Sequence, residues 1–385
     1  MTPLSIAVVG SGFIGPVHVE AARRLGHRVV GILGSSPARG RAAAEALGLP
    51  RSYADLAGLL ADTEVQVVHI ASPNRHHFEQ ARRCIEAGRH VVCEKPLAMT
   101  TAEGGELVRL AREKGIVAAV CYNVRFYPLC LEARERCRRG DLGRIFHATG
   151  SYMQDWLLRD TDFNWRVVSE EGGELRAVAD IGTHWMDLIQ SITGRAIVEV
   201  CADLRTVHPV RRSPEGSTET FSSSSAVERV GVSIPTEDYG SILLRFDDGS
   251  RGAVTVSQVT AGRKNCIRFD IAGSEASLAW DSEQPNELTV GRREPSNELL
   301  PRDPGLLSAN VRPYANYPGG HAEGFPDSFK QLFRAVYGSI ARGETGPDPS
   351  GVAWPTFADG HRELRVCEAI LQSHRESRWV EVAGG

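Results

Sequence analysis

Two short stretches of this sequence place acid–base side chains at close, fixed spacings. The first is Cys93-Glu94-Lys95-Pro96, in which a charged pair closes an apolar run. Lysine is rarely buried without a purpose, because desolvating its charge is costly. Pro96 restricts the backbone of Lys95 to extended conformations and so fixes the direction of its side chain. This stretch predicts an ammonium group held in place at a site.

The second stretch contains Asp180, His184 and Asp187, which enter an apolar, helix-like run that ends near Gly194. Spacings of four and three residues allow the three side chains to share one helix face. A histidine beside a carboxylate suits reversible proton transfer near neutral pH. Taken alone, such a pair is more often a satisfied surface contact, so its interpretation depends on the rest of the sequence.

A glycine-rich turn supplies that context. Gly10, Gly12 and Gly15 directly follow an apolar run and open a helix-like stretch. In a dinucleotide-binding fold the first glycine permits a tight turn, the second lets a diphosphate approach the backbone, and the third lets helix and strand pack closely. Phe13 and Ile14 lie at the helix N-terminus on which the diphosphate would rest. The turn therefore predicts binding of NAD or NADP.

The residues after the second predicted strand bear on the choice between NAD and NADP. An enzyme strict for NAD usually carries an acid about twenty residues past the glycine turn, where it binds the ribose 2′-hydroxyl. Residues 27–44 include no Asp or Glu and offer Ser35, Ser36, Arg39 and Arg41 instead. Hydroxyls and a guanidinium suit a 2′-phosphate, so the sequence favours NADP over NAD. The alternative is that these arginines lie on an exposed helix face and do not bind the cofactor.

Two further strand ends are predicted to face the cofactor. Ser72, Pro73 and Asn74 follow an apolar run, and small residues at the carboxyl end of a parallel strand leave room for a ligand. We expect cofactor contacts from them and also from His77, Glu94 and Lys95. Lys95 would stand where nicotinamide and substrate meet. The neighbouring His76 and His77 lack a nearby third ligand, so no metal is predicted.

The elements that must position these residues alternate regularly along the first part of the chain. Residues 1–122 are predicted to form a doubly wound, parallel Rossmann sheet, with strands at Ser5–Val9, Arg28–Leu33, Val67–Ile70, His90–Cys93 and Val117–Cys121. Residues 123–385 are predicted to form an α+β domain for substrate binding and oligomerisation, with a large, mostly antiparallel open sheet. Its last helix could pack back on the first domain. We expect a mobile surface loop at Ser213–Val227 and an irregular excursion at Gln284–Pro318.

Composition narrows the possible partners. The chain has 385 residues, 42% of them hydrophobic, and a net charge of −4, a balance typical of a globular protein. No broad basic surface favours nucleic acid or anionic lipid, and no apolar run is long enough to cross a membrane. The eight cysteines include no C-x-x-C pair, which indicates reduced, buried thiols. The N-terminus does not resemble a signal peptide, so we expect a cytoplasmic location.

Taken together, these motifs resemble those of the Gfo/Idh/MocA family, named for glucose–fructose oxidoreductase, inositol 2-dehydrogenase and a rhizopine catabolism protein. The resemblance rests on Gly10–Gly15, Glu94–Pro96, Tyr122–Pro128, Gly140–Ile145 and Asp180–His184, which span both predicted domains. It implies a Rossmann domain followed by an α/β domain whose open sheet often forms dimers or tetramers. It also implies that the substrate is a sugar, a cyclitol or a keto form of either. The missing acid near residue 34 departs from the NAD preference of many members.

The resemblance also implies roles for individual residues. It places Lys95, Asp180 and His184 opposite the reacting carbon. We expect substrate contacts from these three and from Arg125, Tyr152 and Trp156. Cofactor contacts are expected to extend to Asn123, Trp165 and Arg166. Trp156, Asn164, Trp165 and Arg166 could bind a polyol or the cofactor on the approach to the site, although packing in a core would explain the tryptophans equally well.

The resulting hypothesis is an NAD(P)-dependent dehydrogenase or reductase acting on CH–OH groups. His184 would accept the hydroxyl proton, Asp180 would orient and stabilise the imidazolium, and Lys95 would stabilise the developing alkoxide. One alternative is a family member that uses resident NAD for transient oxidation in glycoside cleavage or epimerisation. The other is a ligand-sensing homologue without catalysis. We expect a homodimer or homotetramer.

Overall fold

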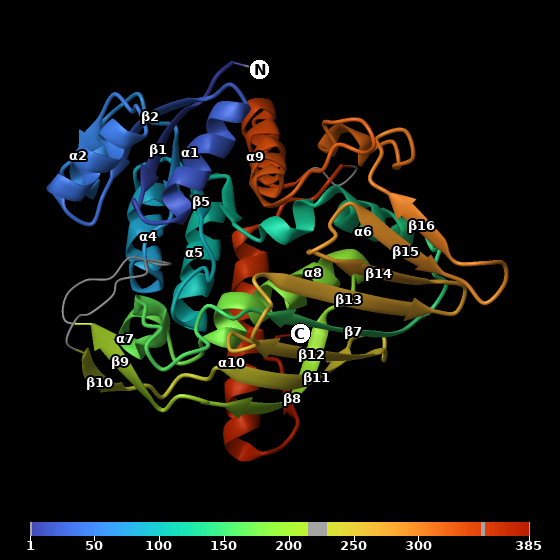
Figure 1. Cartoon of the computed structure of the whole chain (residues 1–385). Helices are drawn as coiled ribbons and strands as arrows, with labels where there is room; N and C mark the ends of the chain where they lie inside the picture. Colours follow the sequence, from blue (N-terminus) through green and yellow to red (C-terminus); the bar gives the residue numbers. More distant parts are fainter. Residues whose placement is uncertain (1, 215–228, 348–350, 385) are drawn as a thin grey trace. The chain divides into compact units, whose positions relative to one another are not determined.

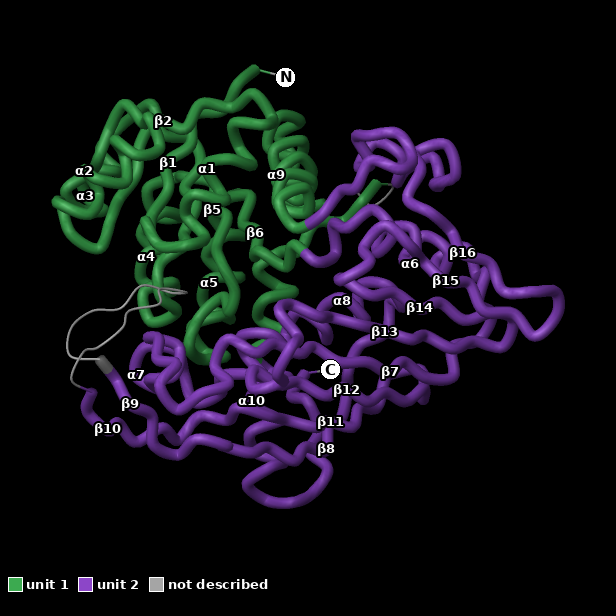
Figure 2. The backbone as a smooth tube through the Cα atoms, in the orientation of Figure 1, with its two compact units in different colours: residues 1–123, 325–364 green, residues 124–324, 365–385 purple. Residues whose placement is uncertain are grey.

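A computed structural model describes residues 2–214, 229–347 and 351–384 of the chain, which divides into two units. Figure 2 colours unit 1, residues 1–123 and 325–364, apart from unit 2, residues 124–324 and 365–385. The predicted division at residue 122 made the second part continuous to the C-terminus. In the structure, residues 325–364 group with unit 1 instead.

Unit 1 is built on a six-stranded parallel sheet with the order β3-β2-β1-β4-β5-β6 (Figure 1). Its strands are β1 Ser5–Val9, β2 Arg28–Leu33, β3 Ser52–Tyr53, β4 Val67–Ile70, β5 His90–Cys93 and β6 Ala118–Val120. The strand order reverses between β1 and β4, where this fold binds its ligands. The predicted doubly wound fold is confirmed, and β3 is a strand that the sequence pattern did not indicate.

Helices cover both faces of this sheet because successive strand residues point to opposite sides. One face packs against α4 and α5 and the start of α10, and the other against α1 and α9. The helices are α1 Ile14–Arg24, α2 Pro37–Ala46, α3 Leu56–Ala61, α4 His77–Glu86, α5 Thr101–Glu113, α9 Phe325–Arg342 and the first part, residues 357–364, of α10 Phe357–Glu376. Local signals start them: a capping box formed by Thr100 and Glu103 opens α5, and Ser36 caps α2.

Unit 2 is built on a nine-stranded, mostly antiparallel sheet with the order β16-β15-β14-β13-β7-β12-β11-β8-β17, in which only β7 and β12 of the described strands run parallel. Its strands are β7 Ile145–Met153, β8 Ile197–Arg205, β11 Tyr239–Phe246, β12 Arg251–Ser257, β13 Cys266–Gly273, β14 Ser277–Asp281, β15 Glu287–Gly291, β16 Glu298–Pro301 and β17 Val380–Glu381. Burial alternates along β11, as expected for a sheet packed on one face. The predicted open antiparallel sheet is confirmed.

Helices α6 Pro128–Arg139 and α8 Thr183–Thr193 pack against each other in unit 2, and α8 also contacts β7. Both helices end at a glycine in the left-handed region, Gly140 with φ 83° and Gly194 with φ 68°. A short helix α7, Ser169–Gly172, precedes a π-helix over Val178–Gly182 that runs directly into α8. The motif around residues 180–184 therefore lies at a change of helical register, a feature frequent at functional sites.

Two expectations about unit 2 need correction. The stretch Gln284–Pro318 is not wholly irregular, because it contains β15 and β16, and Leu288 and Val290 of β15 are buried. Ser213 belongs to β9 Val210–Pro214, which pairs with β10 Arg229–Ser233. Residues 215–227 of the predicted loop lie outside the described residues.

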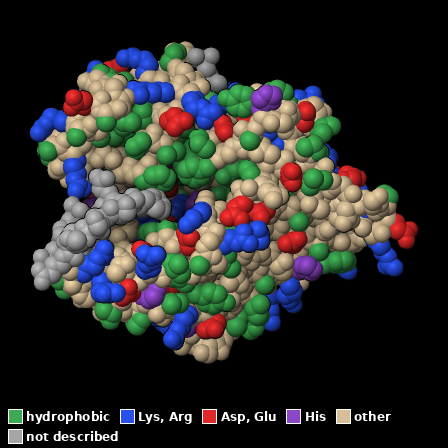
Figure 3. Space-filling view, viewed as in Figure 1, with side chains coloured by type: hydrophobic (Ala, Val, Ile, Leu, Met, Phe, Trp, Pro, Cys, Tyr) green, Lys and Arg blue, Asp and Glu red, His purple; other side chains and the backbone are tan. Residues whose placement is uncertain are grey.

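The described residues include no helix long and apolar enough to cross a membrane. On the face shown in Figure 3, basic and acidic side chains are interspersed. All eight cysteines lie in the described part of the chain and are free thiols.

Candidate active site

The turn after β1 in unit 1 admits only glycine at two of its three positions. Gly10 has φ +109°, and a Cβ there would lie 2.4 Å from the carbonyl oxygen of Ala71. A Cβ on Gly15 would lie 2.2 Å from the carbonyl oxygen of Gly10. Each distance is far below ordinary van der Waals contact, so the absence of a side chain is what lets the turn and α1 pack against β4 and β1.

The third glycine faces open space. Nothing lies within 4 Å of the position that a Cβ on Gly12 would occupy. This space adjoins Phe13 and Ile14 at the start of α1, whose backbone N–H groups carry the positive end of the helix dipole. The turn thus fits a dinucleotide diphosphate, which needs a backbone without side chains beside the N-terminus of a helix.

The residues expected to contact the adenosine ribose lie together beyond β2. Ser35, Ser36 and Arg39 are exposed, and Arg39 Nη1 lies 3.5 Å from Ser35 Oγ. Ser36 Oγ also accepts a hydrogen bond of 3.3 Å from the backbone N–H of Arg39. A guanidinium and two hydroxyls at one exposed turn can bind either ribose hydroxyls or a phosphate. The preference for NADP stays a prediction.

The loops after β4 and β5 are tied together by His77. Its imidazole is fully buried, with Nδ1 2.7 Å from the carbonyl oxygen of Pro96 and Nε2 2.8 Å from that of Ser72. Burial lowers the pKa of His77, although both carbonyls oppose this. The ring of His77 therefore lies between the two loops that carry Ser72, Pro73 and Lys95, and its expected contact with the cofactor stays a prediction.

Glu94 ends a buried chain of hydrogen bonds that the sequence analysis did not anticipate. His18 Nε2 lies 3.1 Å from Glu94 Oε1, the Nδ1 atoms of His18 and His69 lie 2.9 Å apart, and His69 Nε2 lies 2.7 Å from the hydroxyl of Tyr337. If the Tyr337 hydroxyl donates to Nε2 of His69, then Nδ1–H of His69 donates to Nδ1 of His18, and Nε2–H of His18 donates to Glu94. Every group then has a partner with both rings neutral and Glu94 ionised. Burial holds the pKa of His69 well below its usual value, which agrees with a neutral ring.

This chain of hydrogen bonds fixes Glu94, the residue next to Lys95. Lys95 is partly exposed, and its backbone N–H donates to Glu94 Oε2 over 3.3 Å. The Lys95–Pro96 peptide bond is cis. Asn123, expected at the cofactor, is buried and donates through Nδ2 to Ser328 Oγ of α9 over 2.8 Å. The histidines were hidden from sequence reasoning because they come from α1 and β4, far apart along the chain.

In unit 2 the predicted catalytic pair stands where the π-helix meets α8. Asp180 is partly exposed; its Oδ2 accepts a hydrogen bond of 2.8 Å from Gln258, and its Oδ1 lies 3.4 Å from Nε of Arg166. His184 is 8% exposed, and its ring centroid lies 6.2 Å from that of Tyr152. The structure therefore brings together Asp180 and Arg166, and His184 and Tyr152, all named from sequence.

Arg125 and Asp187 form a buried ion pair. Asp187 accepts hydrogen bonds from both Nε and Nη2 of Arg125, the first over 2.6 Å, and the side chains are 7% and 1% exposed. We expected Asp187 to share a face with Asp180 and His184, and Arg125 to contact substrate. The guanidinium binds Asp187 of α8 in a buried position, a pairing that the Asp-x-x-x-His-x-x-Asp spacing alone could not reveal, and the substrate contact of Arg125 stays a prediction.

The remaining predicted residues cluster near the end of β7. The hydroxyl of Tyr152 and Nε2 of Gln154 both donate to Oδ1 of Asn265, over 2.7 and 2.8 Å. Trp156 Nε1 in turn donates to Oε1 of Gln154 over 2.8 Å. Burial raises the pKa of Tyr152, so its phenol is neutral and serves as a hydrogen-bond donor. Tyr152 and Trp156 are thus linked by one network of side-chain amides.

Asn164, Trp165 and Arg166 form a short turn that presents the guanidinium. Asn164 is buried and accepts a hydrogen bond of 3.1 Å from the backbone N–H of Arg166. The Arg166 guanidinium carbon stands 4.4 Å from the centroid of the Trp165 ring, a cation–π distance. The buried Asn164 therefore sets the turn, and the partly exposed guanidinium of Arg166 contacts both Trp165 and Asp180.

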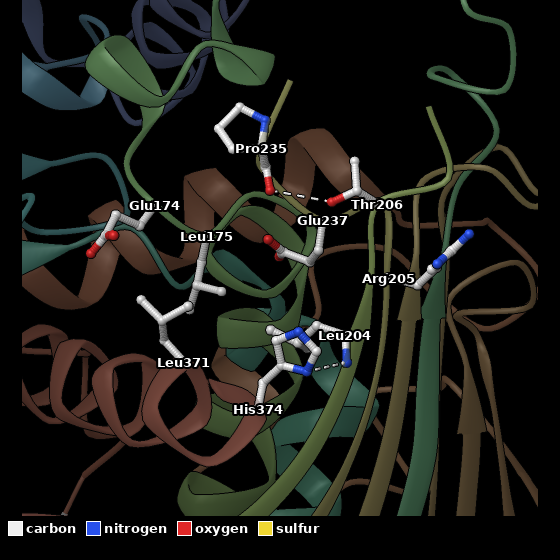
Figure 4. A pocket seen from close by; sticks show the side chains of 9 residues that line it. All are labelled: Glu174, Leu175, Leu204, Arg205, Thr206, Pro235, Glu237, Leu371 and His374. Atoms are coloured by element: carbon white, nitrogen blue, oxygen red, sulfur yellow. Dashed lines mark hydrogen bonds between the residues drawn. The ribbon is translucent and has the colours of Figure 1, made fainter. Parts of the chain in front are cut away.

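A separate pocket in unit 2 does not coincide with these residues. Figure 4 shows Leu204 of β8, Glu237, and Leu371 and His374 of α10 around it. Burial raises the pKa of Glu237, against the effect of backbone N–H donors at the start of the π-helix. No predicted site residue lines this pocket.

Comparison with known proteins supports a Rossmann domain followed by a second domain. Residues 4–122 match the profile of the oxidoreductase family with an NAD-binding Rossmann fold, and residues 130–279 match the GFO/IDH/MocA C-terminal domain. The chain is 29% identical to levoglucosan dehydrogenase of Pseudarthrobacter phenanthrenivorans over 99% of both sequences.

Solved structures agree over the full length. An oxidoreductase domain protein from Kribbella flavida is 30% identical, with a TM-score of 0.88 over 99% of this chain and 100% of that one. A levoglucosan dehydrogenase in complex with NADH and L-sorbose is 27% identical, with a TM-score of 0.88 over 99% of each chain.

Proposed function

This chain belongs to the Gfo/Idh/MocA family of oxidoreductases, and from that premise we propose that it transfers hydride between NAD(P) and a hydroxyl carbon of a pyranose sugar or cyclitol. One observation carries the proposal. Acid–base side chains stand at element ends in both units: Lys95 directly after β5, and Asp180 and His184 where the π-helix enters α8. The likeness to levoglucosan dehydrogenase over the whole chain favours a cyclic sugar as substrate.

The glycine turn and the helix N-terminus of α1 would hold the diphosphate of the cofactor, which when bound supplies the hydride acceptor. In our proposal His184 accepts the hydroxyl proton as the hydride leaves the same carbon. Asp180, as a carboxylate, stabilises the imidazolium that forms. Lys95 donates a hydrogen bond to the oxygen on which negative charge develops. The proton leaves as imidazolium and the two electrons leave with the hydride, so the products are a ketone and reduced cofactor.

For the cofactor we propose NADP, with Arg39 and Ser35 binding the 2′-phosphate. The exposed guanidinium beside two hydroxyls supports this, whereas the relative solved with NADH shows that NAD also suits this fold. Arg39→Ala should weaken NADP(H) binding by about 1.5–3 kcal/mol and leave NAD(H) nearly unchanged. Arg112→Ala, at an exposed position of α5, is the matched control. Titration calorimetry that finds the wild type binding NAD at least as tightly as NADP would overturn this choice.

The test of the function is an absorbance screen for reduced nicotinamide. Levoglucosan, D-glucose, L-sorbose and myo-inositol are each offered with NAD and NADP. Continuous formation of reduced cofactor with one of them is the expected result. Product formation without net reduced cofactor would indicate resident NAD in a transient oxidation. Tight sugar binding with no turnover would indicate a sensor.

For assembly we propose a dimer or tetramer formed through the outer face of the unit 2 sheet. Two cross-strand rows on that face, Ser241–Thr255–Ser151 and Leu243–Ala253–Thr149, carry no charge. Leu243 is 50% exposed in the single chain. An uncharged strip of serine and threonine residues around Leu243 and Ala253, at the centre of an open sheet, supports burial against another subunit. Sedimentation should report a dimer or tetramer, and a monomer at micromolar concentration would remove the idea.

A further inference from the structure

A buried, charged cluster in unit 2 contacts Asp180 through the side chain of Gln258. Arg176 and Gln258 are 2% and 0% exposed, and Asp238 and Arg211 are both 0% exposed. Arg176 donates to Asp238 and, through Nη1, to Oε1 of Gln258 over 3.0 Å. Arg211 donates to the same Asp238 oxygen over 2.6 Å. Burying three charges is costly unless their geometry is well satisfied, and such a cluster is weak evidence for stability alone.

The cluster fixes the orientation of the Gln258 amide. A guanidinium can only donate, so the Gln258 atom 3.0 Å from Arg176 must be the carbonyl oxygen. The amide nitrogen of Gln258 therefore points the other way and donates to Oδ2 of Asp180 over 2.8 Å. A flipped amide would set its NH₂ group against the guanidinium. Arg176 thus forces Gln258 to act as a donor toward Asp180.

The second oxygen of Asp180 faces another donor-only group. Arg166 Nε lies 3.4 Å from Oδ1 of Asp180. The segment before Arg166 is held by the same cluster, because Arg211 also donates to the carbonyl oxygens of residues 157, 159 and 162. Donors on both oxygens favour the carboxylate over the neutral acid.

We propose that Gln258, oriented by Arg176, is a positioning residue that keeps Asp180 ionised and aimed for proton transfer at His184. The proposal rests on the function proposed above, in which Asp180 stabilises the imidazolium of His184. Gln258 is fully buried and so acts through Asp180 without touching the substrate. Its loss should slow turnover and leave substrate binding nearly intact.

The test is a double-mutant cycle on kcat and KM, using the panel sugar and cofactor that give the fastest reduction. Gln258→Leu should lower kcat by about 10–100-fold, by analogy with the loss of a group that orients a metal ligand, with KM within about threefold. In the Asp180→Asn background the same substitution should change kcat far less, because the charge it supports is already gone. Gln190→Leu is the matched control: Gln190 is a buried glutamine of α8 that binds the backbone N–H of Ile197.

The outcomes separate the two proposals. Equal effects of Gln258→Leu in the wild type and in Asp180→Asn would overturn the positioning role, as would a loss of activity no larger than that of Gln190→Leu. If Asp180→Asn itself turns over at the wild-type rate, the catalytic assignment fails first. If Gln258→Leu does not fold, Gln258→Glu provides the second variant. It retains the hydrogen bond to Arg176 but sets a carboxylate against Asp180, and a kcat equal to the wild type would again overturn the proposal.

Discussion

Replacing Asp187 with alanine should destabilise unit 2 severely, because it leaves the buried guanidinium of Arg125 without this counter-ion. The two side chains are 1% and 7% exposed and are joined by two hydrogen bonds. Removing one member of a buried ion pair typically costs about 3–5 kcal/mol. Folded proteins are stable by only about 5–15 kcal/mol in total. Asp187→Ala should therefore lose a large part of the free energy of unfolding.

Equilibrium unfolding in urea, followed by tryptophan fluorescence, measures this change. Five of the six tryptophans lie in unit 2, so the signal reports mainly on that unit. The double variant Arg125→Met/Asp187→Leu should recover most of the loss, because apolar residues of similar size often replace a buried pair at little cost. Glu113→Ala is the control: it breaks the exposed Arg109–Glu113 pair and should cost less than about 0.5 kcal/mol.

Two results would refute this reasoning. One is a cost below about 1 kcal/mol for Asp187→Ala, which would show that the pair is solvated or unimportant. The other is a double variant no more stable than the single one. Turnover of the double variant also decides the role of Arg125. A normal KM would make the sequence-based expectation of substrate contact wrong, and a raised KM at restored stability would support it.

Three further predictions follow from distances in the structure. Gly15→Ala should lose about 1–3 kcal/mol of stability because its Cβ would lie 2.2 Å from a carbonyl oxygen. Gly12→Ala should fold normally yet bind NADP(H) at least about tenfold more weakly by calorimetry, and equal cofactor affinity in Gly12→Ala and the wild type would contradict the proposed diphosphate site. Burial alone would raise the pKa of Asp238, but Arg176 and other donors bring that pKa below its usual 3.8. The ionised Asp238 therefore stabilises the folded protein at neutral pH, and this contribution is lost as the pH falls below 3.8 and through the lowered pKa. Asp238→Asn should then be less stable at pH 7 and lose less stability on acidification, and parallel acid unfolding curves would show otherwise. Tyr337→Phe removes the hydroxyl 2.7 Å from a buried imidazole and should cost about 1–3 kcal/mol in thermal or urea unfolding, while an unchanged stability would rule out that bond.

The Rossmann half of the fold was predictable because its signals are local. β1, β2, β4 and β5 begin and end at the predicted residues, since each is a short, mainly apolar run, and Gly10, Gly34 and Glu94 directly follow β1, β2 and β5. The glycine turn was likewise predictable from its local sequence, and the structure places Gly10 and Gly15 where no side chain could fit. β3 escaped notice because two residues are too short for any periodic pattern.

The parts that sequence reasoning missed depend on partners distant along the chain. Nothing near His77 indicates that its two ring nitrogens lie within hydrogen-bond distance of the carbonyl oxygens of Ser72 and Pro96. Asp187 has the spacing of a site residue, yet its partner is Arg125, 62 positions away. Gln258 carries no motif at all and gains its role only when β12 ends beside the π-helix. Residue spacing predicted which side chains could share a helix face, and tertiary packing determined which partners they contact.

The most direct test of the account is the rate of a single turnover in the wild type and in Lys95→Ala and His184→Ala. Enzyme in excess over the reactive sugar is mixed with cofactor, and reduced nicotinamide is followed by absorbance. Each variant should form it about 10²–10⁴-fold more slowly than the wild type, the range expected for a positioned proton-transfer group. Cofactor affinity and melting temperature should stay close to wild type. A near-normal rate in His184→Ala would contradict the account and place the proton path elsewhere.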